Sequence, residues 1–173
     1  DRAADFEEVV VPVDEAGDVT LSGWYLPSRN GAAVIVRHGS GSNRSDVLDQ
    51  AMVLASHGYG TLAIDARGHG NSAGYAMDTG WFGSDDIASA VTFLQARPDV
   101  DPDRIGVRSA SPTPIFLIAG RGEIDEAHLL RDASPGNLEV WELPDTEHTA
   151  ALATHPTEWE TRVISFFDRE LLR

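Results

Sequence analysis

A chain of 173 residues with 42% apolar side chains is long enough for one domain with a sizeable hydrophobic core. Its formal net charge of −15, with only 13 Lys and Arg residues, argues against nucleic acid and anionic membrane surfaces as partners, because phosphate groups are bound by clustered cations. The absence of Cys excludes a disulfide framework, a thiol nucleophile and a thiolate metal site.

The sequence also bears on membranes and targeting. No apolar run approaches the roughly 18 residues of a membrane span, and no basic-then-apolar signal peptide opens the chain. The sequence begins at Asp1 rather than Met, so address information could lie in an upstream segment. The compartment stays open between the cytoplasm and, if an N-terminal segment is missing, a membrane-associated or secreted location.

The first part of the chain predicts a hairpin followed by alternating strands and helices. Two β-rich runs, Glu7–Val13 and Val19–Pro27, flank a turn that contains Gly and Asp, which indicates an antiparallel hairpin. The continuous apolar run Ala33–Gly39 predicts a buried parallel strand. Helical spacing follows over 45–58, ended by a glycine. A second buried strand is expected at Thr61–Asp65.

The second part continues the alternation of strands and helices. Ser84 is the expected N-cap of a helix that ends before Pro98. The last helix is expected to start with a capping box formed by Thr157 and Glu160. Three further strands are predicted at 104–107, 115–120 and 138–144. The pattern predicts a single α/β domain over residues 1–173, with a mostly parallel sheet, an N-terminal antiparallel hairpin and helices on both faces.

One connection is too short for this pattern. Parallel neighbours in a sheet need a crossover of at least about 10–12 residues. Only seven residues, two of them proline, separate Val107 from Ile115. Either the two runs are not both parallel strands of the sheet, or the sequence joins ends that the natural chain separates.

The order of five motifs resembles that of the α/β-hydrolase family. The motifs are VRHGSGSN, LAIDARGHGNSAG, DPDRIGV, PTPIFLIAG and LPDTEHTAAL. The chain is similar to bacterial serine hydrolases of the peptidase S33 or dienelactone-hydrolase type over nearly its whole length. The resemblance implies an α/β-hydrolase fold.

The resemblance also implies a nucleophile elbow, G-x-S-x-G, directly after the strand at 104–107. Val107 is followed instead by RSASPTP, and the pattern G-x-S-x-G is expected nowhere else in the chain. The elbow is therefore expected to be absent, together with its helix, the next strand and any cap. Crossover length and family order therefore both predict a segment missing near residues 107–111. Ser109 and Ser111 follow the right strand, but they lack the flanking glycines of an elbow, and Pro112 restricts the backbone of Ser111.

The resemblance assigns candidate site residues. It places the general base at His148, whose imidazole can take and return a proton near neutral pH. It places the acid that orients this base at Glu123, three residues after Gly120, with Asp125 as the alternative. It also implies that the backbone amide of Ser40 is an oxyanion-hole donor.

Other polar residues are expected to have structural roles. His155 is the rival of His148, and a structural role suits it better. The resemblance makes Asp65, Arg67 and His69 residues that fix a loop, and His38 is expected to orient the neighbouring loop. Their spacing matches neither a phosphate-binding loop nor a metal site.

The sequence thus predicts a serine hydrolase that acts on an ester, thioester or amide carbonyl through an acyl-enzyme, with its nucleophile in the absent segment. No cofactor is expected, and the partner is a small-molecule or peptide acyl substrate. The alternative is a non-catalytic binding or scaffold protein on the same fold that lacks the nucleophile. The identity of the substrate and the oligomeric state stay open.

Overall fold

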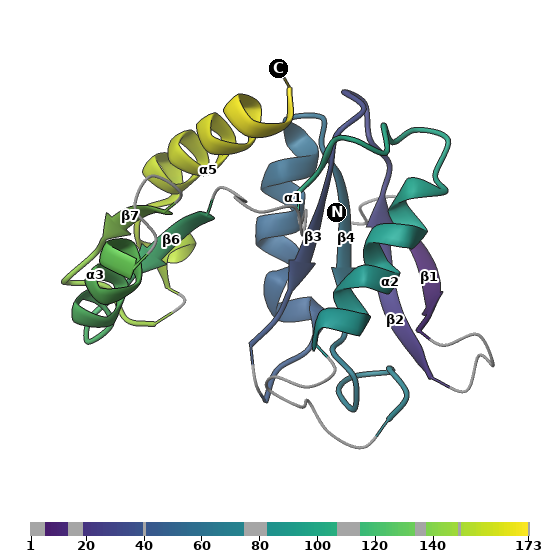
Figure 1. Cartoon of the computed structure of the whole chain (residues 1–173), viewed down its shortest axis with the longest axis horizontal. Helices are drawn as coiled ribbons and strands as arrows, with labels where there is room; N and C mark the ends of the chain where they lie inside the picture. Colours follow the sequence, from purple (N-terminus) through teal and green to yellow (C-terminus); the bar gives the residue numbers. More distant parts are fainter. Residues whose placement is uncertain are drawn as a thin grey trace. The chain divides into compact units, whose positions relative to one another are not determined.

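The chain divides into two compact units, Asp1–Val107 and Arg108–Arg173 (Figure 1). The computed structural model describes residues 6–13, 19–39, 41–74, 83–106, 115–133, 138–148 and 150–172. Residues 107–111, near which a segment is predicted to be missing, lie outside the described residues. The single domain predicted from the sequence stays a prediction.

The first unit contains a five-stranded sheet in the order β1-β2-β4-β3-β5. The strands are β1 (Glu7–Pro12), β2 (Thr20–Leu26), β3 (Ala33–Arg37), β4 (Gly60–Ile64) and β5 (Ile105–Gly106). β1 and β2 form the predicted antiparallel hairpin, and β2 also pairs antiparallel with β4. β3 pairs in parallel with both β4 and β5. The α/β class and the N-terminal hairpin are therefore confirmed.

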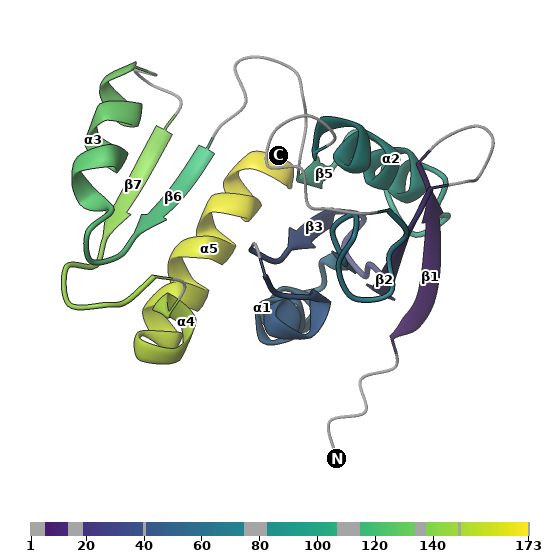
Figure 2. The same ribbon diagram turned by 90° about the horizontal axis from the view of Figure 1, so that it is seen from below.

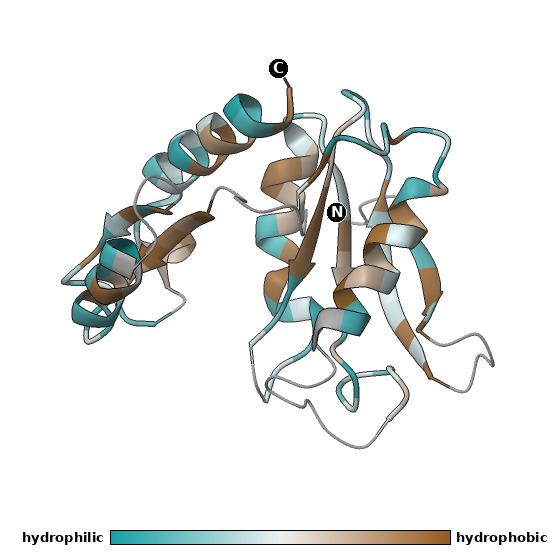
Figure 3. Ribbon diagram, in the orientation of Figure 1, coloured by the Kyte–Doolittle hydropathy of each residue, from teal (hydrophilic) through white to brown (hydrophobic). Residues whose placement is uncertain are grey.

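Helices cover both faces of this sheet. Figure 2 shows α1 (Leu48–Ser56) and α2 (Gly83–Gln95) on opposite sides of it. All five residues of β4 are buried, as expected for a strand covered on both faces. β3 is apolar up to its last residue, Arg37 (Figure 3). The core packs α2 against inward-facing residues of the strands, among them Val11, Leu21 and Leu62.

The first helix begins and ends at recognisable signals. Asn43 accepts the backbone N–H of Ser45 on its side chain at 3.0 Å and so caps a short 3₁₀ turn, Arg44–Val47, which leads into α1. The helix ends before Gly58, whose φ of 93° is the left-handed conformation that favours glycine. The predicted glycine stop is confirmed.

The second unit contains a parallel pair of strands, β6 (Ile115–Ala119) and β7 (Leu138–Glu142), joined through α3 (Ile124–Ala133). Two further helices follow, α4 (Ala151–Thr154) and α5 (Pro156–Leu171). α3 and α5 lie on opposite faces of the pair (Figure 2). Aromatic side chains join α5 to β6, since the rings of Phe116 and Phe166 stack with centroids 5.5 Å apart.

The capping box predicted for the last helix is wrong. The helix starts with Pro156, and its N-cap is His155, which makes no side-chain capping bond. Proline at the first helical position has a preset φ and lacks the N–H that would go unpaired there, so it starts the helix before Thr157. Thr157 lies within the first turn, and its carbonyl oxygen accepts the hydroxyl of Thr161.

The strands on either side of the short connection belong to different sheets. β5 pairs with β3, whereas β6 pairs with β7. Both strands lie in parallel pairs, and an excised stretch that carried a strand between them would leave the same two separate pairings. The segment predicted to be missing therefore stays a prediction.

Candidate functional site

Two loops of the second unit meet where β6 and β7 end. Because the strands are parallel, their carboxyl ends lie at the same edge, and the chain leaves that edge through a turn before α3 and through the loop after β7. The backbone N–H of Leu143 donates to the carbonyl of Ala119 at 2.8 Å, and the N–H of Arg121 donates to the carbonyl of Thr146 at 2.7 Å. These bonds hold the two loops together.

The loops bring the two predicted residues Glu123 and His148 together. Nδ1 of His148 is hydrogen-bonded to Oε1 of Glu123. The second carboxylate oxygen, Oε2, accepts the backbone N–H of Gly120 at 2.8 Å. The imidazole is 77% exposed, and no bond to its Nε2 occurs among the residues that the structure describes. One nitrogen is held, and the other is open to a reactant.

The environment of Glu123 keeps its carboxylate ionised. The amide of Gly120 lowers the pKa of Glu123 below its ordinary value of 4.5, and the hydrogen bond and charge of His148 lower it further, while burial opposes both. An ionised carboxylate next to Nδ1 holds that nitrogen in its protonated form and stabilises an imidazolium. The pair can therefore serve as a general base and the acid that orients it.

We predict that Glu123 makes folding pH-dependent in the acid range. The pKa of Glu123 is lower in the folded chain than its ordinary value of 4.5. The contribution of Glu123 to the free energy of unfolding is therefore complete above pH 4.5, and it is lost as the pH falls through the folded pKa. Replacing His148 by Ala should raise the pKa only in part, since the Gly120 amide is the larger cause. Carbon-13 NMR titration of the carboxyl group measures this. A return to the ordinary value in His148→Ala would contradict the leading role of the amide.

The close contact between the loops requires glycine at position 120. A Cβ atom there would lie 2.8 Å from the carbonyl oxygen of Thr146, which belongs to the backbone and cannot easily move aside. We expect Gly120→Ala to destabilise the chain by about 1–3 kcal/mol in urea unfolding. Gly39→Ala is the matched control, because a Cβ at Gly39 meets no atom within 4 Å. Equal unfolding midpoints for the two variants would refute the prediction.

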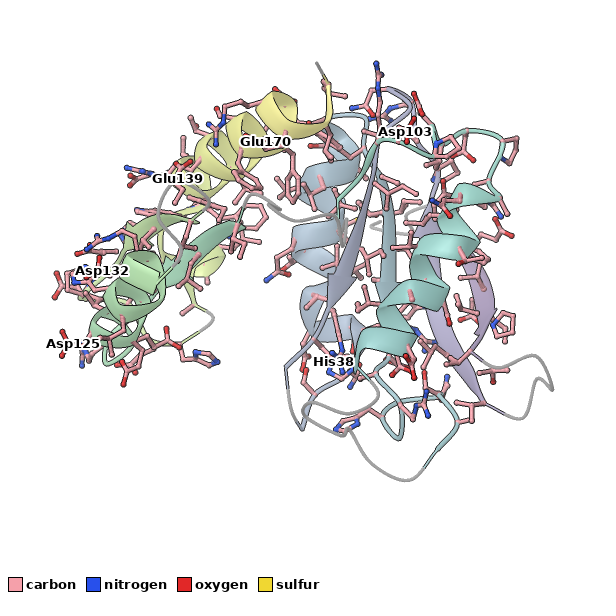
Figure 4. All side chains as sticks on the ribbon, viewed as in Figure 1. His38, Asp103, Asp125, Asp132, Glu139 and Glu170 are labelled. Carbon is pink, nitrogen blue, oxygen red and sulfur yellow. The ribbon has the colours of Figure 1, made fainter. Side chains whose placement is uncertain are left out.

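The alternative acid, Asp125, does not approach the base. It lies in the first turn of α3, exposed and on the outer side of the helix (Figure 4). No hydrogen bond between Asp125 and His148 is present in the described part of the chain. The geometry favours Glu123 as the partner of His148.

The other histidines of this unit have partners of their own. His155 packs edge-on against Trp141, with centroids 6.2 Å apart, and its Nδ1 lies 2.9 Å from the hydroxyl oxygen of Thr154. His128 forms a second histidine–carboxylate pair, with its Nε2 2.7 Å from Glu142. The contacts of His155 agree with the structural role expected for it.

In the first unit, Ser40 lies outside the described residues, but the residue before it, Gly39, is held by His38. Nε2 of this buried ring accepts the N–H of Ala66 at 2.9 Å, so Nδ1 carries the proton and donates to the carbonyl of Gly39 at 2.7 Å. Figure 4 shows His38 at the carboxyl end of β3. His38 therefore orients the loop, as predicted.

A buried ion pair fixes the neighbouring loop after β4. Asp65 accepts the backbone N–H of Arg44 at 2.7 Å and that of Asn71 at 2.9 Å, and it also binds the Arg44 guanidinium. Arg67 pairs with Asp86 of α2 at 2.7 Å, and Nε2 of His69 accepts the N–H of Gly41 at 3.4 Å. These contacts support the loop-fixing roles of Asp65, Arg67 and His69.

The expectation that the sequence lacks the pattern G-x-S-x-G is wrong, because it occurs at Gly70–Gly74. The structure shows that this match is not an elbow. The hydroxyl of Ser72 donates to the carbonyl of Asp65 at 2.7 Å and accepts the N–H of Ser22 at 2.9 Å. The segment follows β4 as a series of turns, whereas an elbow joins a strand directly to a helix. Ser72 is a residue that fixes the loop.

Three further features remain: two candidate serines, a possible metal site and possible membrane-spanning helices. The weak nucleophile candidates Ser109 and Ser111 lie outside the described residues. Within the described ranges, no group of three or more His, Cys, Asp and Glu side chains is placed to hold a metal ion. None of the helices that the structure describes is long and apolar enough to cross a membrane.

Sequence reasoning missed the backbone groups of the site. The amide of Gly120 and the carbonyl of Thr146 leave no pattern in a sequence, because every residue carries such groups and only the fold aims them. The match at Gly70–Gly74, by contrast, could have been found by searching the whole chain for the pattern.

Comparison with known proteins gives a family match over part of the chain and a related bacterial sequence. The model of the family described as serine aminopeptidase, S33, matches residues 28–103. The uncharacterized protein YfhR of Escherichia coli K12 is 31% identical over 111 residues, which are 60% of this chain and 38% of YfhR. The chain thus spans about two fifths of the length of this relative.

Solved structures share the fold over nearly the whole chain. The esterase Pf2001 of Pyrococcus furiosus superposes with a TM-score of 0.86 at 20% identity, covering 98% of this chain and 94% of the esterase. Dienelactone hydrolase of Anabaena variabilis gives a TM-score of 0.67 at 18% identity, covering 96% and 98%. The resemblance to α/β hydrolases is confirmed, and the fold is the α/β-hydrolase fold.

Proposed function

We propose that this α/β-hydrolase-fold chain is part of a serine hydrolase that attacks an ester, thioester or amide carbonyl through an acyl-enzyme. The observation that carries the proposal is the contact between Glu123 and His148 at the carboxyl ends of two parallel strands. An exposed imidazole with one nitrogen fixed by an ionised carboxylate is the arrangement that a base for hydroxyl activation needs.

In this mechanism, His148 moves the protons. Its Nε2 takes the proton from a serine hydroxyl as the serine oxygen bonds to the substrate carbonyl carbon. The imidazolium, stabilised by Glu123, then gives this proton to the leaving group as the bond from that carbon to the leaving group breaks. Water adds to the acyl-enzyme in the same way and releases the acid and the free serine. We assign an oxyanion contact to the amide of Ser40.

The nucleophile is proposed to lie in a segment absent from this sequence, near residues 107–111. The family order supports this position, because RSASPTP follows β5 where an elbow is expected. The matched proteins add support of a general kind, since Pf2001 is described as an esterase and the Anabaena protein as a dienelactone hydrolase.

A second candidate function is a non-catalytic binding or scaffold protein. The observation that favours it is the sequence RSASPTP after β5, because a chain with this sequence has no elbow at that position. Without a nucleophile, the Glu123–His148 pair cannot form an acyl-enzyme.

Intact mass and covalent labelling separate the two candidates. We expect the protein produced from its complete gene to be several kilodaltons heavier than the 18.6 kDa of this chain, and to be labelled by a fluorophosphonate probe. Peptide mapping should place the label on a serine between the β5 and β6 sequences. A mass of 18.6 kDa without labelling would overturn the hydrolase and support the scaffold.

A further inference from the structure

Thr146 stands out in the loop that carries His148. Its side chain is almost completely buried, with the whole residue 2% exposed. All its polar groups have partners: its N–H donates to the carbonyl of Leu143 at 3.0 Å, its carbonyl accepts from Arg121 at 2.7 Å, and its hydroxyl contacts two further side chains. A buried hydroxyl without partners is unfavourable, so these contacts restrict where the loop can lie.

The hydroxyl of Thr146 binds the junction of α4 and α5. Its Oγ1 lies 3.4 Å from Oγ1 of Thr154 and 3.5 Å from Nδ1 of His155. The Thr154 hydroxyl donates to the carbonyl of Ala150 at 2.9 Å, so its oxygen is free to accept from Nδ1 of His155 at 2.9 Å. The packing of His155 against Trp141 fixes this junction to β7.

The carbonyl of Thr146 acts on the opposite side, on the loop that carries the acid. It accepts the N–H of Arg121, and the α-carbon of Gly120 approaches it so closely that a Cβ there would lie 2.8 Å away. Gly120 in turn donates its own N–H to Glu123. A displaced Thr146 carbonyl would therefore displace the backbone that holds the carboxylate.

We propose that Thr146 is a positioning residue of the Glu123–His148 pair. Its hydroxyl fixes the loop of the base to the α4–α5 junction, while its carbonyl fixes the loop of the acid. Both ends of the pair thereby take their position from one buried residue, although Thr146 touches neither side chain of the pair in a hydrogen bond. The consequence for turnover rests on the proposed hydrolase function, but the effect on the geometry of the pair does not.

The test compares three variants in this chain. Thr146→Val removes the hydroxyl at nearly constant shape, and Thr146→Ser restores it. Thr161→Val is the matched control, because the exposed Thr161 hydroxyl donates to the carbonyl of Thr157 within α5 at 2.8 Å. Long-range proton–nitrogen NMR reports which ring nitrogen of His148 carries the proton, and carbon-13 NMR follows the Glu123 carboxyl titration.

We expect Thr146→Val to shift His148 from the Nδ1-protonated tautomer toward the mixture of a free histidine, and to move the Glu123 titration toward its ordinary pH. Thr146→Ser and Thr161→Val should leave both signals in place. A folded Thr146→Val chain with unchanged signals overturns the proposal. Should Thr146→Val not fold, Thr154→Val removes the partner hydroxyl instead, and unchanged signals in that variant overturn it equally.

Activity of the protein from its complete gene gives a second measurement. Thr146→Val should lower kcat by about 10- to 100-fold with little change in KM, because a misplaced base slows the chemical step and not substrate binding. Unchanged kcat in an active enzyme overturns the positioning role. If no variant is labelled or active but the NMR signals shift as expected, the hydrolase proposal falls and the positioning of the pair is supported.

Discussion

Replacing His148 by Ala in the protein from its complete gene should abolish hydrolysis of an activated ester, with kcat falling by about 10⁴- to 10⁶-fold. The reason is that His148, with Nδ1 bound to Glu123 and its ring exposed in the loop after β7, is the imidazole proposed to take the proton of the serine. A serine hydroxyl is a weak nucleophile without a base to remove its proton. Labelling by a fluorophosphonate probe should be lost in parallel.

The chain supplies a matched control for this experiment. His128 also pairs with a glutamate, with 2.7 Å between its Nε2 and Glu142, and it lies in the same unit. It differs from His148 in lying on α3 rather than in the loop after β7. His128→Ala should keep kcat within about twofold of the parent. Equal losses in the two variants would show that the assay follows stability and would contradict the assignment of the base to His148.

Removal of the Asp65 carboxylate should have the largest effect on stability. Asp65 and Arg44 are 1% and 6% exposed, so Asp65→Ala leaves a buried guanidinium without its counter-charge and two backbone N–H groups, of Arg44 and Asn71, without their acceptor. We expect a loss of about 3–5 kcal/mol in the free energy of unfolding. Urea unfolding followed by circular dichroism measures it.

Two further variants make this measurement specific. Asp65→Asn keeps an oxygen that accepts hydrogen bonds but removes the charge. Its free energy of unfolding should therefore lie between those of the parent and Asp65→Ala. Asp46→Ala removes an exposed carboxylate from the first turn of the neighbouring 3₁₀ helix, where a negative charge stabilises by about 0.3–1 kcal/mol. If Asp65→Ala and Asp46→Ala unfold at the same urea concentration, the ion pair does not have the stabilising role inferred for it.

The sequence by itself predicted most of the secondary structure. Strands such as Ala33–Arg37 and Gly60–Ile64 are mostly apolar without alternation, because both of their faces are covered. A helix stop such as Gly58 needs a backbone conformation that glycine adopts readily. These signals are local, so a linear reading finds them. The start of α5 was misplaced because Thr157 and Pro156 offered competing local signals, and proline at the first position prevailed.

The sequence and its family resemblance also supplied both residues of the candidate pair, Glu123 and His148, and favoured Glu123 as the acid without excluding Asp125. Three carboxylates follow β6 within a few residues, and only the turn at Gly120 decides that Glu123 rather than Asp125 approaches the imidazole. That decision depends on a backbone amide and on the carbonyl of Thr146, whose directions are set by the pairing of β6 with β7. Tertiary structure was needed here because hydrogen-bond direction belongs to the folded backbone and is not encoded in residue type.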